Sequence, residues 1–342
     1  MKKNQIIIVA VIVIAVIIGA VVLGSGKGKD KVEDYPTRPI ELIVPYGAGG
    51  GTDVWNRTLA AEMQETLGEN ITVSNMTGGT GAVATDYVLK AEHDGYRILG
   101  TSETNLPIPV MAGVKTTAKD WDYFICAGSP GVVCVHADSP YKTIDDLIEA
   151  AKAKPDTIKA ATTSSGLWFI QATILNTAGD MPIGYSPYDG SRPAILACVS
   201  KETDLVVASA GEVNEFVKAG TLRPLAVMKK EAYDFPTVGE IPAITDSLPG
   251  VSDYLPLDQW IGFSVPSDTP KEVKDALTKA FNEAMKSDTV KNMADEQLST
   301  LFGLSGEEAD SMAEAMQSKM CYLLKDMELT QYDPKEMGVP EP

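Results

Sequence analysis

The segment Pro45-Tyr46-Gly47-Ala48-Gly49-Gly50-Gly51-Thr52-Asp53 joins an apolar run at 40–44 to a helical pattern at 52–67. Its glycines let backbone amides approach a ligand closely, and amides at a helix N-terminus form an anion site. The segment follows the carboxyl end of an expected parallel strand, which is where open α/β sheets bind ligands. We therefore expect an anion-binding loop, with a tight turn capped by Thr52 or Asp53 as the structural alternative.

Two nucleotide-binding motifs do not fit this loop. A Walker loop ends in Gly-Lys followed by Ser or Thr, and no lysine occurs between Lys31 and Lys90. The dinucleotide fingerprint G-x-G-x-x-G, started at Gly47, meets Thr52 in place of its third glycine. The loop therefore predicts an anion site of neither type.

Short β-type runs alternate with longer helical patterns along most of the chain. We expect strands at 40–44, 71–75, 96–101, 132–136, 158–161, 183–185, 205–208 and 225–228. The expected helices are 52–67, 81–92, 143–154, 165–178 and 193–200, and Thr143 with Asp146 forms a capping box at the third of these. This alternation predicts an α/β fold with parallel strands and helical crossovers.

The chain length of 342 residues predicts two lobes rather than one domain. A proline-rich segment at 235–256 leads to a strand at 260–265, and helices follow at 271–287, 288–296 and 305–324. Because these helices need a sheet to pack on, we expect the chain to return to the first lobe. The prediction is a first lobe of 35–128 plus 260–342, a second lobe of 129–259, and a hinged cleft between them.

Residues 1–34 have the form of an export segment. Lys2 and Lys3 precede an apolar run at 6–23, which small, polar and basic residues follow. The length of the run lies at the threshold for spanning a bilayer. A cleaved signal peptide and a retained membrane anchor both remain open.

Charge and cysteine usage exclude several classes of partner and cofactor. Without residues 1–34 the chain has 24 basic (29 − 5) and 44 acidic (47 − 3) residues, a net charge of −20, which makes nucleic acid an improbable partner. The cysteines show neither C-x-x-C spacing nor a histidine partner, so no zinc site or other cofactor is predicted. We expect mostly buried free thiols at Cys126, Cys134, Cys198 and Cys321.

Short motifs continue in a fixed order after the glycine loop. They are Asp94-Gly95-Tyr96, Ser139-Pro140-Tyr141-Lys142-Thr143, Pro187-Tyr188-Asp189-Gly190, the run at 218–226, Trp260-Ile261-Gly262 and Thr269-Pro270. Together with the opening at 35–40, this order resembles the substrate-binding proteins of the tripartite tricarboxylate transporter family, also called Bug-type receptors. The resemblance covers about residues 35–300.

This resemblance implies a two-lobed, periplasmic-binding-protein-like fold of type II that closes on its ligand. It implies an exported protein, periplasmic or tethered at the outer face of the cytoplasmic membrane, that delivers a tricarboxylate, dicarboxylate or related organic acid. The implied partners are the large and small membrane subunits of the permease, and we expect a monomer. A ligand-sensing receptor of the same fold, acting on a membrane signalling partner, is the alternative.

Carried over residue by residue, the family's ligand site falls on loops of both lobes. The positions are Tyr46, Gly47, Ala48, Gly49, Gly50, Gly51, Thr52, Gly78, Gly79, Thr80, Ser102 and Thr104 in the first lobe, and Ser164, Ser165, Tyr188, Asp189 and Arg192 in the second. The first-lobe positions include no lysine or arginine, so amides and hydroxyls must replace the hydration of the carboxylate. This chain lacks the histidine usual in the second-lobe loop and has Asp189 where a basic residue is common.

Four residues each allow a binding role and a structural role. Arg192 could clamp a second carboxylate in bidentate fashion, or begin a helix at the surface. Asp189 and Asp204 could accept hydrogen bonds from an amine or hydroxyl of the ligand, or form turns and caps. Trp168 could stack on the ligand, although an aromatic residue early in a helix is more often part of the core.

An enzyme would need a set of residues for proton transfer or nucleophilic attack. The only histidines are His93 and His136, and neither G-x-S-x-G nor H-E-x-x-H occurs. We therefore predict a binding protein without catalytic activity.

Overall fold

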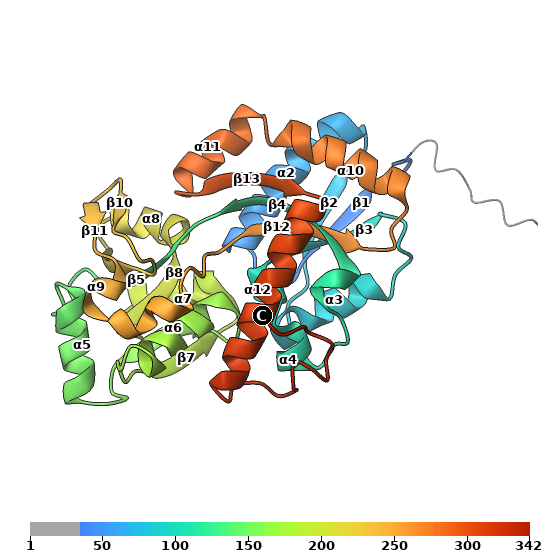
Figure 1. Ribbon diagram of the computed structural model, residues 1–342. Coiled ribbons are helices and arrows are strands. Elements are labelled where there is room, and N and C mark those ends of the chain that lie inside the picture. Colours follow the sequence, from blue (N-terminus) through green and yellow to red (C-terminus); the bar gives the residue numbers. More distant parts are fainter. Residues whose placement is uncertain (1–34) are drawn as a thin grey trace, which may run out of the picture. The chain divides into compact units, whose positions relative to one another are not determined.

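The computed structural model describes residues 35–342, of which residues 36–342 form one compact unit. The predicted export segment at 1–34 lies outside the described residues. Within the described part of the chain, no helix combines the length and apolar character needed to cross a membrane. Two large sheets organise the compact unit, each with helices on its faces (Figure 1).

The first sheet has the strand order β13-β4-β12-β3-β1-β2. Its strands are β1 (Ile40–Val44), β2 (Ile71–Asn75), β3 (Arg97–Ser102), β4 (Trp121–Gly128), β12 (Ile261–Pro266) and β13 (Thr300–Ser305). β1 pairs in parallel with β2 and β3, whereas β12 and β13 are antiparallel to their neighbours. The carboxyl ends of β1, β2 and β3 therefore meet at one edge of the sheet.

The second sheet has the strand order β7-β6-β8-β5-β9. Its strands are β5 (Gly131–His136), β6 (Lys159–Thr163), β7 (Gly184–Tyr188), β8 (Leu205–Ser209) and β9 (Leu222–Val227). β6 is parallel to β7 and β8, and β5 is antiparallel to β8 and β9. A separate hairpin pairs β10 (Tyr233–Phe235) with β11 (Gly239–Ile241).

Helices cover both faces of each sheet. On the first sheet, α2 (Gly51–Leu67), α10 (Lys271–Ala284) and α11 (Asp288–Glu296) lie on one face, and α3 (Ala82–Leu89), α4 (Ile108–Ala112) and α12 (Glu307–Asp326) on the other (Figure 1). The helices of the second sheet are α5 (Ile144–Ala153), α6 (Leu167–Thr177), α7 (Ser191–Val199), α8 (Ala210–Lys218) and α9 (Ile244–Ser247). The described residues also form four 3-10 helices, which are η1 (Gly79–Gly81), η2 (Glu103–Asn105), η3 (Ala118–Asp120) and η4 (Pro249–Tyr254).

Helix α2 shows why the glycine loop is followed by a long helix. Trp55, Leu59 and Met63 recur every four residues and are at most 2% exposed, so they form one buried stripe. Gly68 ends the helix in the left-handed conformation, with φ of 73°. The loop is therefore attached to a helix that the core holds in place.

The sheets are mixed rather than parallel as predicted, and β4 and β13 were not among the expected strands. β4 runs almost directly into β5, with Ser129 and Pro130 between them. The two strands belong to different sheets, so the chain enters the second sheet with no helix in between. β13 escapes sequence analysis because its residues are only half-buried or exposed, so it lacks a clear apolar pattern.

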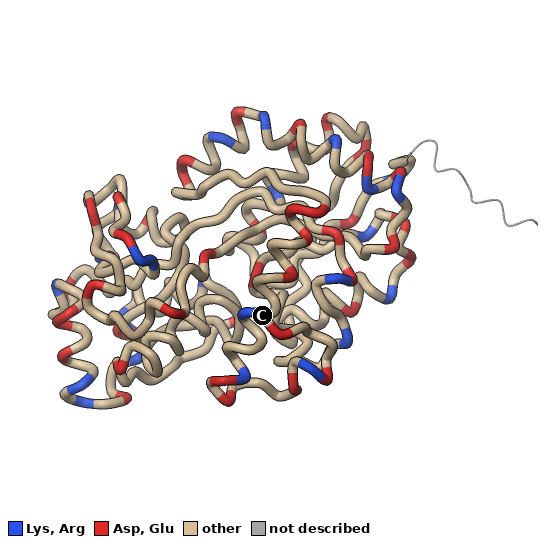
Figure 2. Tube along the Cα trace, viewed as in Figure 1, with Lys and Arg blue, Asp and Glu red and all other residues tan. Residues whose placement is uncertain are grey.

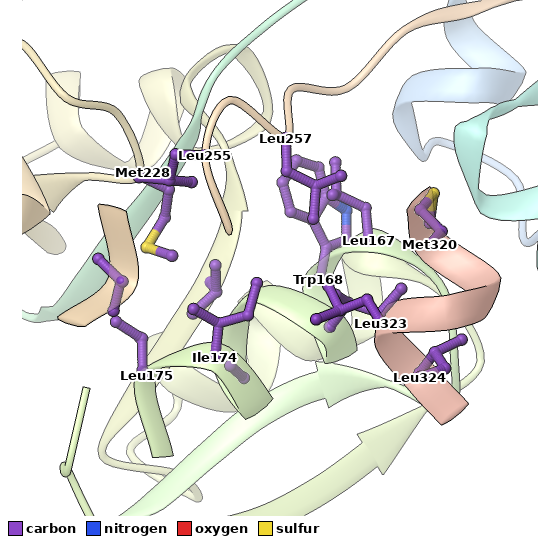
Figure 3. Packing of buried hydrophobic residues seen from close by; sticks show 14 of the residues in the cluster. Leu167, Trp168, Ile174, Leu175, Met228, Leu255, Leu257, Met320, Leu323 and Leu324 are labelled. Atoms are coloured by element: carbon purple, nitrogen blue, oxygen red, sulfur yellow. The ribbon is translucent and has the colours of Figure 1, made fainter. Parts of the chain in front are cut away.

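A large buried cluster lies around α6 and α12. It includes Trp168, which is 4% exposed, together with Leu257 and Leu323, and Figure 3 shows these side chains close together. Segments far apart in the sequence thus share one hydrophobic core. A second cluster joins α7 and α8 to the opposite face of the second sheet.

The surface charge and the cysteines follow the sequence. Figure 2 shows acidic and basic residues interspersed along the trace rather than separated by sign. Cys126, Cys134, Cys198 and Cys321 are buried free thiols, which confirms the prediction for these positions. The capping box of Thr143 and Asp146 at the start of α5 is also confirmed.

Candidate functional site

A cavity of about 270 Å³ is lined by loops that follow strands of both sheets. The loops begin after β1, β2 and β3 in the first sheet and after β6 and β7 in the second. The cavity therefore lies at the carboxyl ends of parallel strands, which is the usual place for a ligand in such folds.

Most residues predicted for the site line this cavity. They are Tyr46, Gly47, Gly50, Gly51, Thr52, Gly78, Gly79, Thr80, Ser102, Thr104, Ser164, Ser165, Tyr188, Asp189 and Arg192. Ala48, Gly49 and Asp204 do not line it. Trp168, for which stacking on the ligand was one alternative, also lines the cavity, as do Gly190 and Ser191 between the predicted Asp189 and Arg192. The other lining residues are Pro45, Thr77, Gly81, Thr163, Pro193, Glu212 and Gln259.

The predicted residues away from the cavity have structural contacts. The backbone amide of Gly49 donates to Asp53 Oδ2 at 2.9 Å. Asp204 Oδ2 accepts from the amide of Lys159 at 2.8 Å, at the start of β6. In this structure Asp204 therefore takes the capping role rather than the binding role.

The glycine loop is held from behind by the side chain of Asp53, which is 3% exposed. Its Oδ1 accepts from Arg57 Nε at 3.0 Å and from Asn75 Nδ2 at 2.9 Å. Burial raises the pKa of Asp53, but the hydrogen bonds from Arg57, Gly49 and Asn75 outweigh it and lower the pKa overall. The same Asn75 Nδ2 donates to the backbone oxygen of Tyr46 at 2.9 Å, so both ends of the loop share one anchor.

The loop after β2 has an unusual backbone. Gly78, Gly79 and Gly81 have φ of 126°, 55° and 97°, and Thr80 has φ of 58°. A β-branched residue in the left-handed region is strained by about 1 to 3 kcal/mol, and strain of this kind clusters at functional sites. Here the strained residue lines the cavity.

Ser102 is the last residue of β3 and Thr104 comes after it, on either side of the buried Glu103. Glu103, which is 1% exposed, accepts from Thr104 Oγ1 and from the amide of Trp260, both at 2.9 Å. Burial raises the pKa of Glu103 to about 8, and the nearby Glu212 carboxylate adds to the increase although the two hydrogen bonds oppose it. Glu103 therefore keeps its proton to a higher pH than an ordinary glutamate does.

Loops of the two sheets meet closely around the cavity. A Cβ on Gly166, which has φ of +84°, would lie 2.2 Å from Thr104 Cγ2. A Cβ on Gly47 would lie 3.3 Å from the backbone oxygen of Asp189. Only glycine permits the first of these approaches, so a loop of the second sheet lies directly against the loop after β3.

Arg192 lines the cavity, but its guanidinium contacts its own lobe. Arg192 Nη1 donates to Glu215 Oε1, and the guanidinium carbon lies 5.0 Å from the centre of the Phe216 ring. Trp168 contributes to the cavity wall and to the core at once. Both residues therefore line the cavity and also make structural contacts.

Glu212 is a charged residue of the cavity wall that the sequence did not predict. Ser209 and Glu212 form an S-x-x-E pattern, which indicates a helix cap. Ser209 does cap α8 by accepting from the Glu212 amide at 3.2 Å. The Glu212 carboxylate, however, reaches the cavity and accepts from the amide of Gly51 at 2.9 Å, a contact between residues 161 positions apart.

Comparison with known proteins identifies the family. The family model of the tripartite tricarboxylate transporter family receptor matches residues 55–328. The chain belongs to this family. Since it is a family of receptors, the prediction of a binding protein rather than an enzyme is confirmed.

Individual relatives agree with this membership. Protein BugT of Bordetella pertussis is 27% identical over 275 residues, which are 76% of this chain and 80% of BugT. The structure of the periplasmic binding protein BugD has a TM-score of 0.76 at 24% identity and covers 90% of this chain and 100% of BugD. An R. palustris protein solved with adipate has a TM-score of 0.77 at 24% identity and covers 87% of this chain and 99% of its own. The likeness of fold confirms the two-lobed periplasmic-binding-protein-like architecture.

Proposed function

We propose that this protein is an exported solute-binding protein that captures a small organic carboxylate and delivers it to the large and small membrane subunits of a tripartite tricarboxylate transporter. The observation that carries the proposal is the cavity in a member of this receptor family, lined by backbone amides and hydroxyls of both lobes. Such donors satisfy a carboxylate without a dedicated cation. The adipate in the R. palustris relative supports the ligand class.

The lobes that close on this ligand are residues 35–128 with 260–342, and residues 129–259. The strand content supports this division, because the first sheet takes β1 to β4 with β12 and β13, and the second takes β5 to β9. The chain passes between the sheets at β4 to β5 and again before β12. The first passage consists of Ser129 and Pro130 alone, which suits a hinge.

A thermal-shift screen of small organic acids against the purified protein tests the binding function. An acid present at 100 times its dissociation constant should add about 2.7 kcal/mol to the free energy of unfolding. A screen of mono-, di- and tricarboxylates in which no acid raises the melting temperature would contradict the proposal.

Transport and export need separate experiments. A strain that lacks this protein should grow poorly on the bound acid and should regain growth when the protein is restored. Protease added to cells whose outer wall has been opened should digest the protein, because residues 35–342 lie outside the cytoplasm under this proposal. Full protection from the protease would count against export.

A further inference from the structure

The carboxylate of Glu212 lies at the N-terminus of α2, against the glycine loop. Its Oε1 accepts from the amide of Gly51, the first residue of α2, at 2.9 Å, and from Ser191 Oγ, at the first residue of α7. Its Oε2 accepts from Ser209 Oγ at 2.8 Å. A side chain of the second lobe thus accepts a hydrogen bond at the N-terminus of α2, the helix that follows the glycine loop.

This contact changes what the glycine loop offers to a ligand. The amide of Gly51 is engaged, and a Cβ on Gly51 would lie 3.4 Å from Glu212 Oε1, so the carboxylate lies directly against the loop. In the described part of the chain, the amide of Gly47 makes no hydrogen bond. The Glu212 carboxylate therefore occupies one end of the cavity wall, while the amide of Gly47 stays available as a hydrogen-bond donor to a ligand.

The formal charge of the lining residues also disfavours a ligand with several negative charges. Among the described residues that line the cavity, Arg192 is the one cation, and Asp189 and Glu212 are the acids, which sums to 1 − 2 = −1. The Arg192 guanidinium is engaged by Glu215 of the same lobe. A ligand with one carboxylate adds one charge to this balance, whereas a dicarboxylate must place its second charge in a small cavity that already holds an anion.

We propose that Glu212 is a specificity-determining residue that restricts the cavity to acids with a single carboxylate. The inference rests on the proposed carboxylate-binding function and narrows it. The carboxylate of the ligand binds to the remaining amides and hydroxyls of the first lobe, and its other end faces Trp168 and Pro193, which offer apolar surface. A second carboxylate is excluded by repulsion from Glu212 in a partly desolvated site.

Titration calorimetry with matched acids tests the inference. The pairs are hexanoate with adipate, butyrate with succinate, and benzoate with terephthalate, each of which differs by one carboxylate. For any pair that binds, we expect the monocarboxylate to bind at least about tenfold more tightly than the dicarboxylate. Equal or tighter binding of the dicarboxylate would overturn the inference while leaving the proposed function standing.

The variant Glu212→Gln isolates the charge. The glutamine oxygen still accepts from Gly51 and Ser191, so the contact between the lobes is retained while the negative charge is lost. The preference for the monocarboxylate should fall to about threefold or less. An unchanged preference in the folded variant would overturn the inference.

A matched control is Glu149→Gln, which removes an exposed charge from α5 and should leave the preference unchanged. If Glu212→Gln does not fold, equal or tighter binding of the dicarboxylate by the unaltered protein still overturns the inference. Failure of every acid in the three pairs to bind would overturn this inference and, together with a negative thermal-shift screen, the proposed function as well.

Discussion

Asn75, the last residue of β2, fixes Asp53 in the first turn of α2, with Asn75 Nδ2 2.9 Å from Asp53 Oδ1. The same nitrogen lies 2.9 Å from the backbone oxygen of Tyr46. The glycine loop therefore has a second support besides its attachment to β1 and α2. A loop that donates amides to a ligand must be held in place before the ligand arrives, because ordering it on binding lowers affinity.

The first prediction concerns this support. Asn75→Ala removes two hydrogen bonds from the loop without removing a cavity-lining residue, so ligand affinity should fall by about five- to thirtyfold. Calorimetry with the bound acid measures the change. The control is Asn176→Ala, which removes a single bond to the oxygen of Ile183 at 2.7 Å in the second lobe and should leave affinity unchanged. Equal losses in both variants would show that Asn75 acts only through stability.

Gly50 provides a second prediction. A Cβ there would lie 3.4 Å from Ser191 Oγ and 3.6 Å from the oxygen of Gly47, which is ordinary contact, so Gly50→Ala should bind within a few-fold of the unaltered protein. The methyl groups of Gly50→Val would press on these atoms or enter the cavity that Gly50 lines, so binding of every acid should fall by more than about tenfold. Normal binding by Gly50→Val would mean that the site is not at this loop.

Glu103 makes stability depend on pH. The folded protein holds the Glu103 proton up to about pH 8, whereas the unfolded chain releases it near the ordinary value of 4.5. Between these values the folded state binds more protons, so this group makes the free energy of unfolding fall as pH rises. Urea unfolding at several pH values should show a shallower decline for Glu103→Gln than for the unaltered protein, and parallel profiles would contradict the assignment. Glu149→Gln, at an exposed position, should keep the original slope.

The variant Trp168→Ala distinguishes a role of Trp168 in the core from a role in stacking on the ligand. It is 4% exposed and belongs to the large buried cluster, so Trp168→Ala should lower the free energy of unfolding by about 3 to 5 kcal/mol. Val238→Ala, at a side chain that is 52% exposed, should change it by no more than about 0.5 kcal/mol. A large loss of affinity with little loss of stability would instead assign Trp168 to ligand stacking.

Local patterns account for the part of the fold that the sequence predicts. β1, β2 and α2 follow from apolar runs and helical periodicity, and the capping box at Thr143 identifies the start of α5. β13 has no such pattern, because its residues depend on pairing with β4 at the edge of the sheet. Its position is a property of the assembled sheet rather than of its own residues.

The candidate site shows the same limit. Most predicted loop residues line one cavity, because the carboxyl ends of parallel strands meet at a common edge. The hydrogen-bond partners of two charged side chains were not predictable from local patterns. Glu212 accepts from Gly51, which is 161 positions away, and Arg192 donates to Glu215, which is 23 positions away on another helix. The helix-cap pattern of Ser209 and Glu212 predicts the start of α8, but it does not predict which group the Glu212 carboxylate contacts.

The central claim is that the protein binds a small carboxylate and does not convert it. The most direct test is titration calorimetry with the acid that gives the largest thermal shift, followed by recovery of that acid after long incubation. The account predicts saturation at one acid per chain and recovery of the acid chemically unchanged. Absence of saturable binding, or consumption of the acid by the protein, would contradict it.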